Sequence, residues 1–71
     1  MKHKENVNNI IYELRKAKSI TQEELAMAVD VSRQTIISIE KGTYTPSLLL
    51  AMKIAKYFNL KIENIFTYEE K

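Results

Sequence analysis

The sequence predicts an all-α fold, a compact domain of five helices with two short helices joined by a tight turn at its centre. Glycine and proline each occur once among 71 residues, which leaves few positions for the turns of a large sheet. Apolar residues recur every three or four positions through most of the chain, as they do in amphipathic helices. A chain of this length has room for one domain.

The first two helices are separated by a clear start signal. We expect the first helix from about Val7 to Lys18, where apolar residues recur at helical spacing. Thr21 and Glu24 fit a capping box, in which each side chain satisfies a backbone amide at the start of the second helix. We expect this helix to end near Asp30, because aspartate is one of the few residue types that tolerate positive φ in a tight turn.

Start and stop residues also mark the later helices. Ser32 is suited to cap the third helix and Gly42 to end it. Pro46 marks the start of the fourth helix, with Thr45 or Ser47 as its cap. The face of the fourth helix that we expect to be buried consists of Leu48, Ala51, Met52, Ile54, Ala55 and Phe58.

The end of the chain predicts a short fifth helix and a tail. Asn59 can end the fourth helix in the left-handed conformation, and a fifth helix from about Ile62 to Phe66 closes the domain. The sequence therefore divides into a flexible N-terminus at residues 1–6, a helical domain at residues 7–66 and a C-terminal tail at residues 67–71. Coil and a short strand are both open for the tail.

The composition argues against catalysis and metal binding. Cysteine is absent, and the one histidine is His3, near the N-terminus, so the usual thiolate and imidazole ligands are lacking. The sequence contains no glycine-rich phosphate loop. We therefore expect no enzyme, no metal, no cofactor and no small-molecule ligand.

The chain is expected to be cytoplasmic and without a membrane partner. Residues 1–9 are too polar for a signal peptide, and the longest apolar run, residues 48–52, is far short of the roughly 20 residues that a membrane span needs. The formal net charge of +2 is weak evidence for a nucleic-acid partner, so the positions of the charges matter more than their sum.

Residues 22–41 have the properties of a helix-turn-helix. The two helices are short, and Ala26 supplies the small residue that a close crossing needs. At about 100° per residue, Arg33, Gln34 and Ile37 point away from the apolar side of the third helix, with Ser38 at the edge of this arc. Arginine matches guanine, glutamine matches adenine, and an apolar side chain can contact the thymine methyl group. In an arbitrary helix these residues would more often be solvated, but their setting favours base contacts.

Five segments stand in a specific order and spacing: Gln22–Ala26, Val31–Ile36, Ile39–Gly42, Pro46–Leu48 and Lys53–Ala55. Together they resemble the Xre family, the phage-repressor and Cro type of helix-turn-helix regulators, over about residues 7–66. The resemblance implies the phage-repressor fold and transcriptional regulation by binding to operator DNA. Departures from the family pattern lie at Asp30, Thr45 and Leu49, and they bear on affinity and partners rather than on the class of protein.

The resemblance also implies roles for matching residues. Arg33 and Gln34 would be the main base readers, with Ser38 as a lesser one. Arg15 and Glu40 match an internal ion pair that ties the first helix to the third. Contacts to backbone phosphates would come from Gln22, Ser32, Thr35, Lys41, Thr43 and Tyr44.

The predicted function is that of a sequence-specific regulator, a repressor that binds double-stranded DNA as a homodimer on a pseudo-palindromic operator. The alternative is the same fold acting as an antitoxin or adaptor whose main partner is another protein. Candidates for the dimer contact are apolar residues near the C-terminus and one leucine of the fourth helix: Ile62, Ile65, Phe66, Tyr68 and Leu49.

Overall fold

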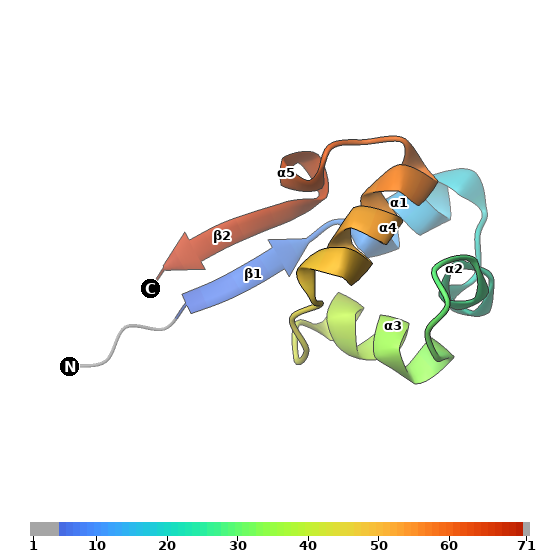
Figure 1. The fold of residues 1–71 in the computed structure, drawn as a ribbon, viewed down its shortest axis with the longest axis horizontal. Coiled ribbons are helices and arrows are strands. Elements are labelled where there is room, and N and C mark those ends of the chain that lie inside the picture. Colours follow the sequence, from blue (N-terminus) through green and yellow to red (C-terminus); the bar gives the residue numbers. More distant parts are fainter. Residues whose placement is uncertain (1–4, 71) are drawn as a thin grey trace.

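The computed structural model describes residues 5–70 and confirms the five predicted helices (Figure 1). It also contains a two-stranded antiparallel sheet, formed by the two ends of the described chain. The helices are α1 (Ile11–Lys18), α2 (Gln22–Ala28), α3 (Arg33–Lys41), α4 (Leu48–Phe58) and α5 (Ile62–Ile65). The strands are β1 (Glu5–Asn9) and β2 (Phe66–Glu70). The two strands extend away from the helices as a ribbon (Figure 1).

The first helix begins later than its apolar spacing predicts. Val7 lies in β1, opposite Tyr68 of β2, and α1 starts at Ile11. Asn9 marks the change: its Oδ1 accepts a hydrogen bond from the amide of Ile11 (3.1 Å), and its Nδ2 donates to the carbonyl oxygen of Ile39 (3.0 Å). An asparagine side chain that bonds to nearby backbone competes with helix formation. The pairing of β1 with a distant strand leaves no mark in local periodicity.

The predicted boundaries at both ends of the domain change accordingly. Glu5 and Asn6, predicted to lie in a flexible terminus, are part of β1. The predicted tail contributes most of β2, so that it forms a strand rather than coil. Residues 1–4, which include His3, and Lys71 lie outside the described residues, and the predictions made for them stay predictions.

Predicted N-cap residues start three of the helices. The hydroxyl of Thr21 accepts a hydrogen bond from the amide of Glu24 (3.0 Å), and the carboxylate of Glu24 accepts one from the amide of Thr21 (2.8 Å). The capping box of α2 is therefore complete. Ser32 caps α3, and Ser47, one of the two candidates, caps α4.

Left-handed backbone conformations end or separate the helices where the sequence predicts them. Asp30 in the turn between α2 and α3 has φ 62°, Gly42 after α3 has φ 82°, and Asn59 after α4 has φ 58°. Ser19 after α1 has φ 57° and was not predicted, because serine has no marked preference for this region. Each of these residues lets the chain reverse over a short distance.

The core lies where α1, the two helices of the central pair, α4 and α5 meet. Half-buried apolar residues close its edges, among them Ile20 and Val31 on either side of α2. The core consists of Ile11, Leu25, Ala26, Val29, Ile36, Ile39, Leu50, Ile54, Ala55, Phe58 and Ile65.

The buried face of α4 confirms four of the six predicted positions, which are Ala51, Ile54, Ala55 and Phe58, and differs at the other two. Leu48 and Met52, predicted to be core residues, are 72% and 53% exposed, whereas Leu50 is only 7% exposed. The inward stripe is Leu50, Ile54 and Phe58, at i, i+4 and i+8. Leucine occupies three consecutive positions at the start of α4, so the apolar pattern alone does not determine which of them faces the core.

Candidate nucleic-acid interface

The two helices of the helix-turn-helix are held together by packing and by hydrogen bonds in the turn. α2 and α3 pack directly on each other, and Ala26 is buried where they cross. The amide of Val31 donates a hydrogen bond to the carbonyl oxygen of Ala26 (2.9 Å), and the amide of Asp30 donates to that of Met27 (3.3 Å). These bonds satisfy the end of α2 and set the angle at which α3 leaves the turn.

Arg15 and Glu40 form an ion pair behind α3. Arg15 Nε lies 2.5 Å from Glu40 Oε2, and Arg15 Nη2 donates a hydrogen bond to Glu40 Oε1 (3.0 Å). Arg15 Nη1 donates to the carbonyl oxygen of Ile20 (2.9 Å), and Gln22 Nε2 donates to Glu40 Oε1 (3.2 Å). The hydrogen bond to Glu40 raises the pKa of Arg15 against the opposing effect of burial. The cluster joins α1, the loop before α2, and α3.

The outer face of α3 carries the side chains predicted to read bases. Arg33 and Gln34 are exposed at its first two positions, and Ile37 and Ser38 are half-buried one turn later. Gln34 Nε2 lies 3.5 Å from Ser38 Oγ, so these two polar groups are neighbours on the surface. Lys41 is exposed in the last turn. With its apolar side held by Ile36 and Ile39 in the core, α3 presents a fixed row of donors, acceptors and one apolar side chain.

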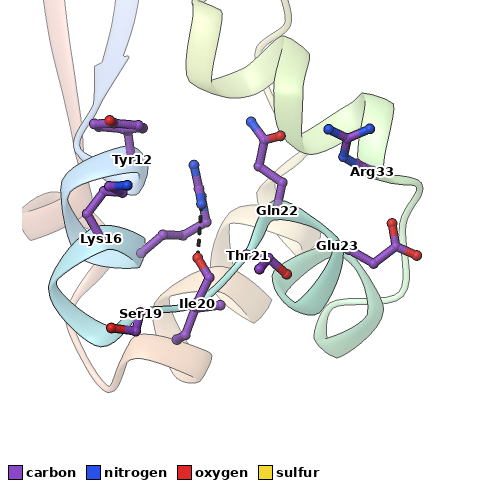
Figure 2. Close-up of a pocket in the computed structure, with 9 residues that line it drawn as sticks. Tyr12, Lys16, Ser19, Ile20, Thr21, Gln22, Glu23 and Arg33 are labelled. Atoms are coloured by element: carbon purple, nitrogen blue, oxygen red, sulfur yellow. Dashed lines mark hydrogen bonds between the residues drawn. The ribbon is translucent and has the colours of Figure 1, made fainter.

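An open groove of about 630 Å³ lies between α1 and the start of α2, and Arg33 at the start of α3 borders it. Figure 2 shows Tyr12 and Lys16 of α1 on one side of it and Gln22 and Arg33 on the other. Glu23 also lines the groove. Gln22 is therefore placed both to touch a ligand in the groove and to support α3 through Glu40.

A smaller hollow of about 230 Å³ lies on the opposite flank of α3, where Gln34 and Ser38 form one wall. Ser32, Thr35 and Tyr44 complete its lining. The hydroxyls of Ser32 and Thr35 lie 3.0 Å apart and share a hydrogen bond. The exposed side of α3 therefore stands as a ridge between the groove that Arg33 borders and the hollow beside Gln34 and Ser38.

The structure divides the predicted phosphate contacts between these two flanks. Gln22 lies on the flank of α1, and Ser32, Thr35 and Tyr44 lie on the other. Thr43 follows α3, and its hydroxyl donates a hydrogen bond to the carbonyl oxygen of Ser38 (3.2 Å), so it helps to end the helix.

Two residues beside the site were not predicted from the sequence. Tyr12 and Lys16 line the groove together with Gln22 and Arg33. Nothing in the sequence distinguishes Lys16 from Lys18, since both are basic residues in the last turn of α1. Only the packing of α1 against the helix-turn-helix selects Lys16.

Within residues 5–70, no cluster of three histidine, cysteine, aspartate or glutamate residues is arranged to hold a metal ion. In the same part of the chain, every helix is too short or too polar to cross a membrane.

A family model described as helix-turn-helix matches residues 11–65, which is most of the chain. The chain belongs to the Xre-type helix-turn-helix family. The match begins at the first residue of α1 and ends at the last residue of α5. In this family member it therefore covers all five helices and leaves out the two strands.

Relatives of this Xre-type chain include proteins named as regulators. It is 65% identical over 52 residues to an uncharacterized helix-turn-helix-type transcriptional regulator of Methanocaldococcus jannaschii. The matched residues cover 73% of this chain and 79% of that protein. It is 33% identical over 60 residues to the cryptic phage CTXphi transcriptional repressor RstR of Vibrio cholerae, covering 84% of the chain and 54% of RstR. It is 35% identical over 63 residues to the transcriptional activator BcrR of Enterococcus faecalis, covering 89% of the chain and 31% of BcrR.

Two solved structures resemble this Xre-type fold. The restriction-modification controller protein C.AhdI from Aeromonas hydrophila is 30% identical, with a TM-score of 0.70 over 75% of this chain and 80% of C.AhdI. The transcriptional regulator VanUg is 24% identical, with a TM-score of 0.77 over 94% of this chain and 89% of VanUg. Residues 11–65 make up less than 94% of the chain, so the likeness in fold to VanUg extends into the strands.

The predicted dimer contacts of this Xre-type chain differ in their accessibility. Leu49 and Tyr68 are exposed, whereas Ile62 and Phe66 are half-buried against the core. Ile65 is 1% exposed and belongs to the core, so its side chain is not on the surface that a second copy could reach. Charge at Ile65 would therefore disturb folding before it could report on association.

Proposed function

We propose that the protein is a transcriptional regulator that binds specific sequences of double-stranded DNA through the outer face of α3. The observation that carries this proposal is the pair Arg33 and Gln34, exposed at the start of a helix whose opposite face is fixed in the core. Their side chains are those best suited to hydrogen-bond guanine and adenine in the major groove. Membership in the Xre-type family supports the same function.

In the proposed complex, α3 lies in the major groove with its N-terminal residues on the base edges. Arg33 recognises a guanine and Gln34 an adenine, while Ile37 contacts a thymine methyl group and Ser38 adds a weaker polar contact. The polar groups on the two flanks of α3 bind phosphates of the two strands that border the groove. These phosphate contacts fix the position of α3 without reading the sequence. Lys41 adds one of them.

We further propose that two copies bind a pseudo-palindromic operator. Two recognition helices would then occupy major grooves about 34 Å apart, which is one turn of DNA. Leu49 and Tyr68 are the exposed members of the predicted dimer contact. The likeness to RstR supports a repressing role, and the likeness to BcrR supports an activating role equally. Measuring transcription from the bound promoter with and without the protein distinguishes repression from activation.

A protein partner is the second candidate function. Leu48, Leu49 and Met52 lie on the outer side of α4, and each is more than half exposed. Neighbouring exposed apolar residues of this kind favour a contact with another protein. A different protein that co-purifies with the chain in a fixed ratio would support this candidate, and a pure homodimer would contradict it.

Replacement of Arg33 tests the proposed function directly. Arg33→Ala should weaken binding to the preferred sequence by about 1–3 kcal/mol and relax the preference at one base pair, because one bidentate contact is lost. Binding of wild type and variant to a set of operators with single changes is the measurement. Lys56→Ala, an exposed basic position on α4, is the matched control and should bind like wild type. Equal losses of Arg33→Ala on operator and random DNA would contradict the assignment of Arg33 to a base.

A further inference from the structure

A second groove lies on the side of α4 that faces the turn between α2 and α3. It consists of two adjoining hollows, of about 250 Å³ and about 410 Å³, which share Val29, Asp30 and Lys53 in their walls. Leu49 borders the first hollow and Tyr57 the second, and both side chains are exposed. This surface, the α4 groove, is separate from the groove beside α1.

The α4 groove combines apolar walls with an excess of positive charge. Val29 and Leu50 of the core line it. Lys53 and Lys56 are exposed on its α4 side, and within residues 5–70 neither forms a hydrogen bond or an ion pair. Asp30 is the one acidic residue among the described lining residues of the two hollows. The groove therefore presents apolar surface beside two unpaired cations.

The length of the groove fits a short helix. Leu49 and Tyr57 are eight residues apart on α4, which corresponds to about 12 Å along the helix axis. An amphipathic helix bound in a groove places its apolar side chains at positions i, i+3, i+4 and i+7, which cover a similar distance. Two turns of a bound helix would therefore contact both side chains.

The two lysines favour a partner that carries carboxylates. Complementary charges across an interface guide association and exclude wrong partners. A second copy of the chain fits less well, because a two-fold interface uses the same patch on both copies and would bring like-charged lysines together. Of the two exposed candidates for the dimer contact, Leu49 therefore suits an acidic partner better than a second copy.

One end of the α4 groove adjoins the side of α3 that is proposed to face DNA. Thr35 and Tyr44 line both the first hollow of the α4 groove and the hollow beside Gln34 and Ser38. In the proposed complex, a DNA strand borders that second hollow. Carboxylates held in the α4 groove would then lie near DNA phosphates, and like charges repel each other.

We propose that the α4 groove binds an acidic amphipathic helix of another protein, and that this partner and DNA weaken each other's binding. Lys53 and Lys56 pair with carboxylates of the helix, and its apolar side chains contact Leu49 and Tyr57. The docking site rests on the groove alone, whereas the effect on DNA rests on the proposed function. The partner would provide a means of releasing the protein from its operator.

Selection of peptides tests the docking site without DNA. From a display library of random peptides about 16 residues long, which allows about four helical turns, the purified full chain should enrich sequences with aspartate or glutamate beside apolar residues at helical spacing. Lys53→Glu should weaken the best peptide about tenfold or more, because an attractive charge pair becomes repulsive. Lys61→Glu makes the same change at an exposed position outside the groove, and this matched control should bind like wild type.

Two leucines test the apolar part of the contact. Leu49→Ala should weaken the same peptide about fivefold, since part of an apolar contact is lost. Leu48→Ala removes the same atoms from an exposed position outside the α4 groove and should keep the wild-type affinity. Arg33→Ala should also keep it, which distinguishes binding in the groove from an acidic peptide that imitates DNA on α3. Thermal melting of each variant confirms that it folds.

Operator DNA tests the second part of the proposal. A saturating concentration of the selected peptide should weaken operator binding about fivefold or more, and bound operator should weaken peptide binding by the same factor, because coupling between two sites is reciprocal. Independent binding of peptide and operator would overturn the opposition between partner and DNA.

The remaining outcomes separate the docking site from the proposed function. Failure to select any peptide that distinguishes wild type from Lys53→Glu would overturn the docking site. A homodimer that dissociates on Lys53→Glu, measured by sedimentation, would overturn it too, because a second copy would then occupy the groove. Specific operator binding by wild type would leave the proposed function intact in both cases. Peptide binding that depends on Lys53, without specific DNA binding, would support the docking site and overturn the proposed function.

Discussion

At the scale of single residues, Arg15 is the point at which three segments of the chain meet. Its guanidinium group bonds to Glu40 of α3 and to the carbonyl oxygen of Ile20, and its Cζ lies 5.5 Å from the centroid of the Tyr12 ring. Because the pKa of Arg15 is raised in the folded protein, its contribution to stability is present at every pH below the ordinary arginine value and is lost only in strongly alkaline solution. The orientation of α3 therefore does not vary with the protonation of Arg15 near neutral pH.

Removal of the acidic partner should be costly. Glu40→Ala leaves Arg15 nearly buried without a counter-ion, which should lower the free energy of unfolding by about 3 kcal/mol or more. Urea unfolding measures this, with Glu13→Ala as the control because Glu13 is exposed on α1 and should change stability by only about 0.5 kcal/mol. If the two variants proved equally stable, the ion pair would not be what fixes α1 to α3.

The residues that the sequence predicted best are those whose role depends on near neighbours. Thr21 and Glu24 lie within one helical turn, so their capping box can be recognised without any knowledge of the fold. The pairing of Arg15 with Glu40 crosses 25 positions and was available only through the resemblance to the Xre family. Neither source pointed to Tyr12 and Lys16, because their position beside Gln22 and Arg33 depends on the tertiary fold.

At the scale of elements, α4 shows how an apolar pattern can predict a helix and most of its inner face without showing which residue of its first turn is buried. Leu48, Leu49 and Leu50 are equivalent in hydrophobicity, and only Leu50 is buried. The partners of Leu50 in the core come from other helices and are not visible in the local sequence. The existence of α4 and most of its inner face were therefore predictable, but the choice among the three leucines at its start was not.

Truncation of two leucines on α4 tests which of them faces the core. Leu50→Ala should destabilise the protein by about 2–5 kcal/mol, as for other buried leucines. Leu48→Ala removes the same atoms from an exposed position and should change stability by about 0.5 kcal/mol or less. Thermal or urea unfolding of both variants is the measurement. A larger loss for Leu48→Ala than for Leu50→Ala would mean that α4 presents the opposite face to the core.

The pairing of β1 with β2 is a second feature that the local sequence could not predict. β1 and β2 are 61 positions apart at the pair Val7 and Tyr68, and each strand is only five residues long. A two-stranded sheet is marginal alone, so the ribbon depends on the half-buried Phe66 and on the hydrogen bond from the amide of Ile10 to the carbonyl oxygen of Ile65 (3.1 Å). Local sequence carries little of this information.

At the scale of the whole molecule, the helices hold α3 as a ridge with a hollow on each side. Arg33 and Gln34 stand on the ridge, while Lys16 and Tyr44 mark the two flanks. The sequence predicted the ridge, since the outer face of one helix follows from its own periodicity. It could not show on which side of α3 each residue predicted to contact a phosphate lies, because that depends on tertiary packing.

The most direct test of this account is selection of bound sequences from a pool of random DNA duplexes, with the purified protein at near-physiological salt. The account predicts a palindromic motif whose half-site centres lie about 10 base pairs apart, since two copies of α3 would read successive major grooves. Failure to enrich any motif, with binding that disappears as salt is raised, would contradict it and would reduce the basic surface around α3 to a nonspecific electrostatic patch.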